Sequence, residues 1–258
     1  RVTAITRAGF DKMRSAGREE RPFEIRWQDR AGRERRALAA AVIDASGTWD
    51  QPNPMGADGL CVPGETGAGD VVAYGIPDIL GADRMRYRDR HVLVVGSGHS
   101  AIHAVLDLIA LGHAHPATRV TWAIRTDTID KLLGGGLNDR LPERGALGIA
   151  ATEAISAGQL DLLAGFAAQA VEREGGGVIV RGLRGGEAID LAVDRIVVAT
   201  GFRPGLDMVR ELRVELDPAV EAPPALSPLI DPNLHSCGTV RPHGVVELAH
   251  PETGFYIA

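Results

Sequence analysis

The sequence predicts an α/β fold with three layers around a parallel β-sheet. An apolar run at 91–95 leads through a glycine-rich turn into a segment, 101–111, whose apolar residues recur with the period of a helix. A second apolar run follows at 119–124, and a third, at 195–199, ends in Ala-Thr-Gly. Strands without polar alternation are typical of a parallel sheet that is covered on both faces, so these runs are assigned to one sheet.

The chain before the glycine turn is predicted to contain several strands. Phe23, Ile25 and Trp27 alternate with polar neighbours, which indicates a half-buried strand. A later run is apolar nearly throughout and ends at Ser46 and Gly47. The expected order is a half-buried strand at 22–28, a turn at 29–32, a second strand, a buried parallel strand at 39–45, a proline-rich loop at 48–54 and a connector at 55–70.

The turn at 96–101 has the pattern G-x-G-x-x-A between a strand and a helix. Gly96 allows a tight turn, Gly98 lets the backbone approach a pyrophosphate, and Ala101 lets the helix pack close to the strand. The helix N-terminus adds free N–H groups and partial positive charge. A plain glycine turn is the alternative, but the strand–turn–helix order favours a Rossmann-like NAD(P)-binding domain. Its candidate cofactor-binding residues are Gly96, Ser97, Gly98, His99, Ser100 and Ala101.

The residue after the next strand indicates which nucleotide binds. An acidic residue normally accepts the ribose 2′-hydroxyl of NAD(H) at this point, whereas an arginine accommodates the 2′-phosphate of NADP(H). The strand at 119–124 is followed by Arg125, and no acid occurs before Asp127. A guanidinium binds a phosphate bidentately, so Arg125 favours NADP(H). The alternative is a solvated arginine at a strand end.

The rest of the chain has weaker signals. The helix after the turn is expected to stop at Gly112, and Gly134–Gly136 form a loop. The strand at 195–199 ends in Thr200 and Gly201, small residues that let a ligand or a crossing chain approach, as Ser46 and Gly47 do. The remaining expected elements are a helix at 143–157, a strand at 160–163, a hairpin at 178–191 and a strand at the C-terminal end.

Composition excludes several classes of function. The net charge of −6 gives no electrostatic footprint for nucleic acid, and no apolar run approaches the ~20 residues that span a bilayer. Cys61 and Cys237 fit neither C-x-x-C nor zinc spacing, and no signal peptide is visible, so a cytoplasmic setting is expected.

His99 and His103 lack a third ligand, so no metal is expected. No catalytic side chain can be assigned, and G-x-S-x-G is absent.

Taken in order, the segments 42–54, 92–101 and 197–204 resemble the two-dinucleotide-binding-domain flavoproteins, most closely their flavin-containing monooxygenase-like branch. The resemblance implies a partial FAD-binding domain at 1–65, an NAD(P)-binding domain at 66–200 and a return to the FAD-binding domain at 201–258. It implies that Gly96, Gly98, Ser100 and Ala101 hold the NADPH pyrophosphate and that Arg125 holds the 2′-phosphate. It also implies that Ser46, Gly47, Thr200 and Gly201 lie near the flavin–nicotinamide junction.

Two departures from that family refine the expectation. The G-x-G-x-x-G loop that binds FAD does not occur in the chain, so we expect it upstream of Arg1 in the intact protein and weak FAD binding by this chain alone. The monooxygenase fingerprint is also absent, and residues 70–77 occupy its place.

The expected function is an NADPH-dependent flavoprotein oxidoreductase, monooxygenase-like, that transfers a hydride from NADPH to FAD. Its small-molecule substrate is unassigned, and a homo-oligomer is left open. The alternative is a non-catalytic NADP-binding module or sensor domain. A dehydrogenase with NADP alone is disfavoured, because Tyr74, Tyr87 and Tyr256 lack a lysine at relay spacing.

Overall fold

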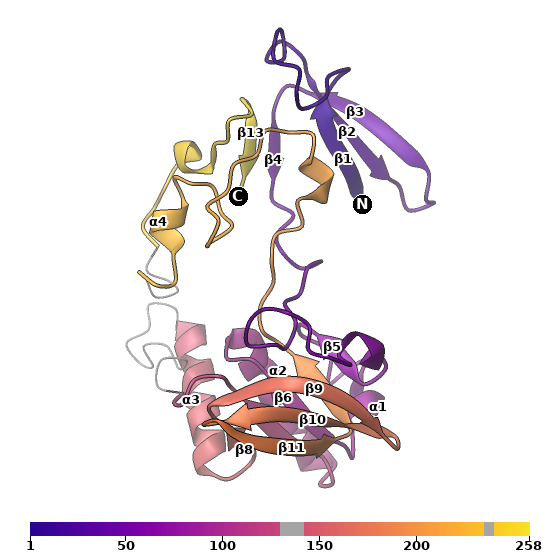
Figure 1. Cartoon of the computed structure of the whole chain (residues 1–258), viewed down its shortest axis with the longest axis vertical. Helices are drawn as coiled ribbons and strands as arrows, with labels where there is room; N and C mark the ends of the chain where they lie inside the picture. Colours follow the sequence, from indigo (N-terminus) through magenta and orange to yellow (C-terminus); the bar gives the residue numbers. More distant parts are fainter. Residues whose placement is uncertain (130–141, 235–239) are drawn as a thin grey trace. The chain divides into compact units, whose positions relative to one another are not determined.

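The computed structural model describes residues 1–129, 142–234 and 240–258, and the chain forms two compact units (Figure 1). The discontinuous unit consists of residues 1–51 and 203–258, and the inserted unit of residues 52–202. The first boundary therefore falls at Gln51, earlier than the expected residue 65, because Met55 and Val62 pack into the core of the inserted unit. The assignment of FAD and NADP to the two units stays a prediction.

The inserted unit is built on a five-stranded sheet with the order β5-β12-β6-β7-β8. Every pairing in this sheet is parallel, as predicted. The strand order reverses at β6: the chain passes from β6 to β7 on one side, and returns later to β12 on the other. The strands are β5 (Val72–Tyr74), β6 (His91–Val95), β7 (Arg119–Ala123), β8 (Asp161–Leu163) and β12 (Arg195–Val198).

Both faces of this sheet are covered, which explains the apolar strands. Val92 and Val94 of β6 pack among the helices, while Leu93 and Val95 pack against a second sheet. Alternate residues of a strand point to opposite faces, so a strand buried on both sides has no polar positions.

One layer consists of helices. They are α1 (Arg84–Tyr87), α2 (His99–Ala114) and α3 (Pro142–Ser156), and α3 confirms the helix expected at 143–157. The apolar face of α2, including Ala101, Ala104 and Leu108, is fully buried. The expectation that Gly112 ends α2 is wrong, because the helix continues to Ala114. A glycine inside a helix costs only about 1 kcal/mol, and the chain leaves the helix just before Pro116.

The other layer is an antiparallel sheet with the order β11-β10-β9, which lies in front of the parallel sheet in Figure 1. Its strands are β9 (Phe166–Glu174), β10 (Gly177–Arg184) and β11 (Glu187–Val193). The structure thus confirms the three layers and the hairpin at 178–191. Strand β9 was not predicted, and residues 55–70 contribute a short 3-10 turn, η1 (Thr66–Ala68).

The discontinuous unit contains an antiparallel sheet, β1-β2-β3, and a parallel pair, β4 and β13. The buried parallel strand expected at 39–45 is confirmed as a parallel strand over Val42–Asp44, but it is buried on one side only, because Val42 and Asp44 are buried whereas Ile43 is 69% exposed. The elements of this unit are β1 (Val2–Arg7), β2 (Phe23–Gln28), β3 (Glu34–Ala39), β4 (Val42–Asp44), η3 (Asp207–Val209), α4 (Ser227–Ile230), η4 (Val245–Leu248) and β13 (Phe255–Ile257).

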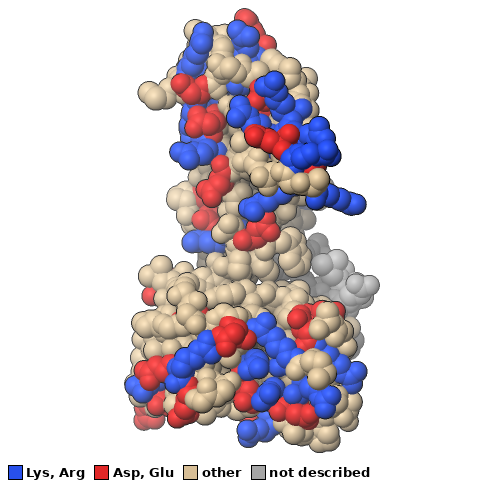
Figure 2. All heavy atoms as spheres, turned by 90° about the vertical axis from the view of Figure 1, so that its right-hand side faces the viewer, with Lys and Arg blue, Asp and Glu red and all other residues tan. Residues whose placement is uncertain are grey.

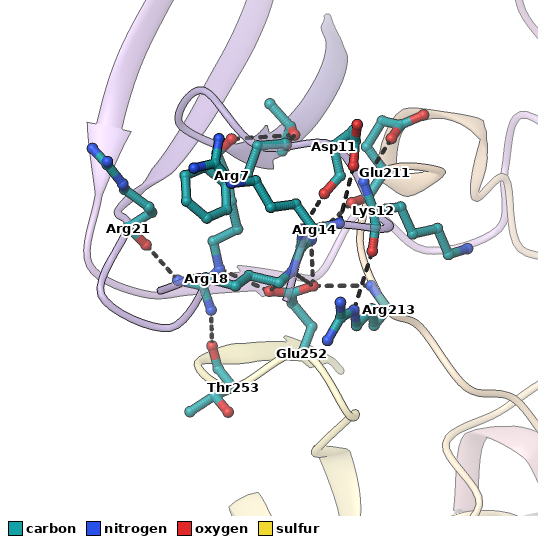
Figure 3. A network of polar contacts seen from close by, with 12 residues as sticks. Arg7, Asp11, Lys12, Arg14, Arg18, Arg21, Glu211, Arg213, Glu252 and Thr253 are labelled. Carbon is teal, nitrogen blue, oxygen red and sulfur yellow. Dashed lines mark hydrogen bonds and ion pairs between the residues drawn. The ribbon is translucent and has the colours of Figure 1, made fainter. Parts of the chain in front are cut away.

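A buried ionic network joins the two segments of the discontinuous unit (Figure 3). The carboxylate of Glu252 accepts hydrogen bonds from Nε of Arg7 at 2.7 Å and from Nη2 of Arg18 at 2.7 Å. The backbone N–H of Arg213 donates to the same carboxylate at 3.0 Å. The Arg7, Arg18 and Glu252 side chains are 2–3% exposed. Residues before β2 are therefore tied to residues just before β13.

Surface charge is mixed. Figure 2 shows basic and acidic side chains intermingled on one face of the molecule, and pairs such as Arg181 with Glu172 carry both signs on the antiparallel sheet. Among the helices of the described part of the chain, none is long and apolar enough to cross a membrane.

Candidate functional site

The turn after β6 takes a shape that requires glycine at its first position. Gly96 has a φ of +133°, and a Cβ there would overlap the carbonyl of Ala199, just after β12. Its N–H donates to the carbonyl of Ala123, which ends β7, at 3.1 Å. The turn is therefore fixed against both neighbouring strands.

Gly98 is the N-cap residue of α2 and needs no glycine for internal packing. Its φ of −84° is open to any residue, and a Cβ there would meet no atom of the described residues within 4 Å apart from its own chain neighbours. No side chain of the described residues caps the 16-residue helix, and its first turn holds no acidic residue. Open space at an uncapped helix N-terminus suits a phosphate, because backbone N–H groups and the helix dipole both favour negative charge.

A buried tryptophan, which sequence reasoning missed, holds this turn in place through a hydrogen bond. Trp122 in β7 is fully buried, and its Nε1–H donates to the carbonyl of Gly96 at 2.7 Å. A buried indole N–H needs a partner, and here the partner is the turn itself. The signal available in the sequence was a tryptophan within an apolar strand beside the glycine motif.

Arg125 lies just beyond β7, at the same edge of the sheet as the glycine turn. Its side chain is exposed, and Nη1 donates to the carbonyl of Ala57 at 3.4 Å. Among the residues that the structure describes, this is the one contact of the guanidinium; it is long and its acceptor is neutral, so most of the donors are left for a further acceptor.

Thr200 and Gly201 follow β12, and here a crossing chain approaches. The hydroxyl of Thr200 donates to the carbonyls of Asn53 at 2.8 Å and Pro54 at 3.0 Å. The N–H of Asn53 donates back to the carbonyl of Gly201 at 2.9 Å. The structure thus shows the approach of a crossing chain that these small residues were predicted to allow. A direct contact of Thr200 or Gly201 with a cofactor stays a prediction.

A buried carboxylate lies in the loop before β5, and sequence reasoning missed it too. Glu65 is 1% exposed and accepts hydrogen bonds from the N–H of Met55 at 3.0 Å and of Val62 at 2.9 Å. The hydroxyl of Tyr74, at the end of β5, donates to it at 2.8 Å. Burial and the neighbouring carboxylate raise the pKa of Tyr74, so the phenol stays neutral. A glutamate in a glycine- and proline-rich connector gave no signal of this role.

Ser46 and Gly47 belong to the discontinuous unit and follow β4. They line a cavity of ≈ 670 Å³ together with Trp49, Met208 and other residues of the same unit. The N–H of Ser46 donates to the carboxylate of Asp44 at 2.9 Å. This volume is within the range of ligand pockets, about 300–1,000 Å³.

The structure therefore gathers part of the predicted site. Gly96–Ala101, Arg125 and Thr200–Gly201 follow three neighbouring strands of one sheet, β6, β7 and β12, at their carboxyl ends. Ligands of open α/β sheets bind at this edge, where the strand order reverses. Ser46 and Gly47 lie in the other unit, beside a separate cavity.

The edge is suited to binding a dinucleotide. It offers an open, uncapped helix N-terminus at Gly98 and a guanidinium at Arg125, which fit a pyrophosphate and a 2′-phosphate. Within the described ranges, no group of three or more His, Cys, Asp or Glu residues could hold a metal ion. Cys61 is a free, exposed thiol, while Cys237 and Gly134–Gly136 lie outside the described residues.

Comparison with known proteins found matches among solved structures. No family model matches the sequence, and no curated protein does. Bacillithiol disulfide reductase Bdr (YpdA) from Bacillus cereus is 19% identical with a TM-score of 0.66, and the match covers 100% of this chain and 61% of that one. Thioredoxin reductase from T. acidophilum is 15% identical with a TM-score of 0.60, and the match covers 100% and 64%.

An ornithine N-hydroxylase from Kutzneria sp., whose structure contains reduced FAD, NADP⁺ and L-ornithine, is 18% identical with a TM-score of 0.55. That match covers 84% of this chain and 58% of the hydroxylase. The chain thus shares its fold with these solved structures, and this agrees with the fold that the resemblance implied. The chain spans about three fifths of the length of these structures, as their covered shares of 58–64% show.

Proposed function

We propose that the chain is part of an FAD- and NADPH-dependent oxidoreductase and that its inserted unit binds NADP(H). The observation that carries the proposal is Gly98, the N-cap of a 16-residue helix without a side-chain cap, where a Cβ would meet no other atom of the described residues within 4 Å. The likeness of the chain to solved structures, among them an ornithine N-hydroxylase with reduced FAD and NADP⁺, supports it.

The residues of the inserted unit would bind and orient the nucleotide. Gly96 and Gly98 bring the backbone close to the pyrophosphate, and the N–H groups of the first turn of α2 donate to it. Arg125 binds the 2′-phosphate, so the unit prefers NADP(H) to NAD(H), which lacks this group. No side-chain acid or base is required, because a hydride carries its own electron pair and its transfer moves no separate proton.

The discontinuous unit would contribute to the flavin site. Ser46 and Gly47 border the cavity in this unit and would allow a flavin ring or its chain to approach closely. Bound FAD would supply the hydride acceptor and the subsequent redox chemistry.

The subsequent reaction is either disulfide reduction or substrate oxygenation. The solved structures include a bacillithiol disulfide reductase and an ornithine N-hydroxylase, so the fold accommodates both. Of these we favour the monooxygenase-like reaction, because the segments at 42–54 and 197–204 resemble that branch, although residues 70–77 lack its fingerprint. Substrate-dependent oxygen uptake would support it, and reduction of a disulfide by NADPH without oxygen uptake would contradict it.

The test uses the complete open reading frame that contains this chain. The visible spectrum of the purified protein is recorded anaerobically, and NADPH and NADH are then added separately. A bound flavin that NADPH bleaches in preference to NADH is the expected result. A colourless protein that binds NADPH without turnover would instead favour a binding module or sensor, and an equal response to both nucleotides would contradict the role of Arg125.

A further inference from the structure

Tyr74 lies at the edge of the parallel sheet where the carboxyl ends of the strands meet, although no sequence motif marks it. It ends β5, the strand that pairs with β12, so it follows the same edge as Thr200 and the glycine turn. The pairing continues past the strand, because the N–H of Gly75 donates to the carbonyl of Val198 at 2.9 Å. The position of Tyr74 along this edge is therefore fixed by the sheet.

The side chain of Tyr74 is also fixed, yet it is not part of the core. The residue is 37% exposed, while its hydroxyl donates to the buried carboxylate of Glu65 at 2.8 Å. Glu65 is in turn held by the two backbone N–H groups of Met55 and Val62. A large aromatic ring that is partly exposed and anchored by its polar end offers a preorganised surface for a flat ligand.

The strand order indicates which half of the dinucleotide reaches Tyr74. The glycine turn follows β6, and Arg125 follows β7 on one side of it. The 2′-phosphate belongs to the adenosine half, so Arg125 assigns that half to the side of β7 and β8. A dinucleotide that crosses at the reversal of strand order then extends its other half over β12 and β5. Tyr74 ends the last of these strands.

We propose that Tyr74 is a positioning residue for the nicotinamide half of NADP(H), with Glu65 holding its ring in place. The inference rests on the proposed function, since it requires a dinucleotide at the glycine turn. The ring supplies a wall against which the nicotinamide end packs, and the adenosine half makes no contact with it.

The test compares the whole dinucleotide with its adenosine half. Calorimetric titration of the full 258-residue chain with NADP⁺ and with adenosine 2′,5′-bisphosphate is repeated for Tyr74→Leu and Tyr74→Phe. Leu183→Ala is the control, because Leu183 has a similar exposed fraction, 39%, but lies on β10 in the antiparallel sheet. Thermal unfolding shows whether each variant is folded.

We expect Tyr74→Leu to weaken NADP⁺ binding roughly two- to tenfold, as the loss of one aromatic contact predicts. Binding of the bisphosphate should be unchanged, and Tyr74→Phe, which keeps the ring, should show a smaller loss. Bound NADPH should also have a different nicotinamide fluorescence in Tyr74→Leu than in the unaltered chain.

Three results would overturn the inference. Unchanged NADP⁺ affinity in a folded Tyr74→Leu chain would show that Tyr74 does not contact the nucleotide. An equal loss for both ligands would show that Tyr74 acts on the fold or on the adenosine half. If the unaltered chain binds neither ligand, the proposed function fails and the role of Tyr74 fails with it.

Discussion

At the scale of single residues, Gly96 and Gly98 illustrate two different reasons for a glycine. Gly96 is required by the chain itself, since a Cβ would overlap the carbonyl of Ala199. Gly98 is not required by the described part of the chain, since its backbone is ordinary and a Cβ there would meet no other described atom within 4 Å. Only a glycine such as Gly98, which the fold does not need, indicates a ligand site. This difference between Gly96 and Gly98 can be tested.

Gly98→Ser should separate stability from binding. Serine is a better N-cap residue than glycine, so we expect the chain to be as stable or more stable by a few tenths of a kcal/mol. The added side chain would occupy the space for the pyrophosphate, so NADP⁺ affinity should fall about tenfold or more. Calorimetry and thermal unfolding measure the two effects. Gly67→Ser is the control, because a Cβ at Gly67 also meets no atom within 4 Å, and unaltered binding in Gly98→Ser would contradict this role.

Arg125→Ala should change which nucleotide the chain prefers. Losing hydrogen bonds from a charged group to a phosphate costs about 1.5–3 kcal/mol, so we expect NADP⁺ to bind at least about tenfold more weakly. NAD⁺, which lacks the 2′-phosphate, should bind as before. Arg184→Ala removes another exposed arginine as a control. Equal losses of affinity for both nucleotides would show that Arg125 does not bind the 2′-phosphate.

At the scale of elements, the parallel sheet was predictable and its surroundings were less so. The strands at 91–95 and 195–198 and the buried face of α2 follow directly from apolar runs and helical periodicity. Strand β9 was missed because its sequence, rich in alanine and glutamate, has little strand propensity and is paired by tertiary contacts. The hydrogen bonds of Thr200 and Glu65 connect residues distant in sequence or hidden in a loop, and no local pattern reports them.

Thr200→Val should destabilise the inserted unit. The substitution keeps the shape of the side chain but removes the donor to the carbonyls of Asn53 and Pro54. We expect a loss of about 1–2 kcal/mol in the free energy of unfolding, because those acceptors lose a partner. Thermal unfolding of the chain measures it, with Thr200→Ser as the variant that keeps the hydroxyl. A Tm identical to that of the unaltered chain would mean that water replaces the hydroxyl at no cost.

At the scale of the whole molecule, Glu252 connects segments from the two ends of the chain. Burial alone would raise the pKa of its carboxyl group, but the hydrogen bonds from Arg18 and Arg7 outweigh that effect and lower it. A lowered pKa in the folded state means that the stabilisation is present above the ordinary pKa of 4.5 and is lost as the pH falls through the lower, folded value. Nothing in the sequence marked Glu252, because the two arginine side chains that bind it are more than two hundred residues away.

Glu252→Gln should therefore weaken the discontinuous unit at neutral pH. Removing the charge leaves Arg7 and Arg18 buried without a counter-ion, which costs about 3 kcal/mol or more. We expect faster hydrogen exchange in β1 and β13, measured by mass spectrometry, and a smaller effect of acid on the variant than on the unaltered chain. Glu187→Gln, on the exposed end of β11, is the control. Exchange that is unchanged at neutral pH would contradict a stabilising role for the network.

The central proposal is that NADP(H) binds at the turn between β6 and α2. Hydrogen exchange of the full chain with and without saturating NADP⁺ tests it most directly, because it locates the bound nucleotide along the sequence. We predict slower exchange at residues 96–101 and around Arg125, with no change in β10 and β11. Unchanged exchange at 96–101 when the nucleotide is bound would contradict the proposal.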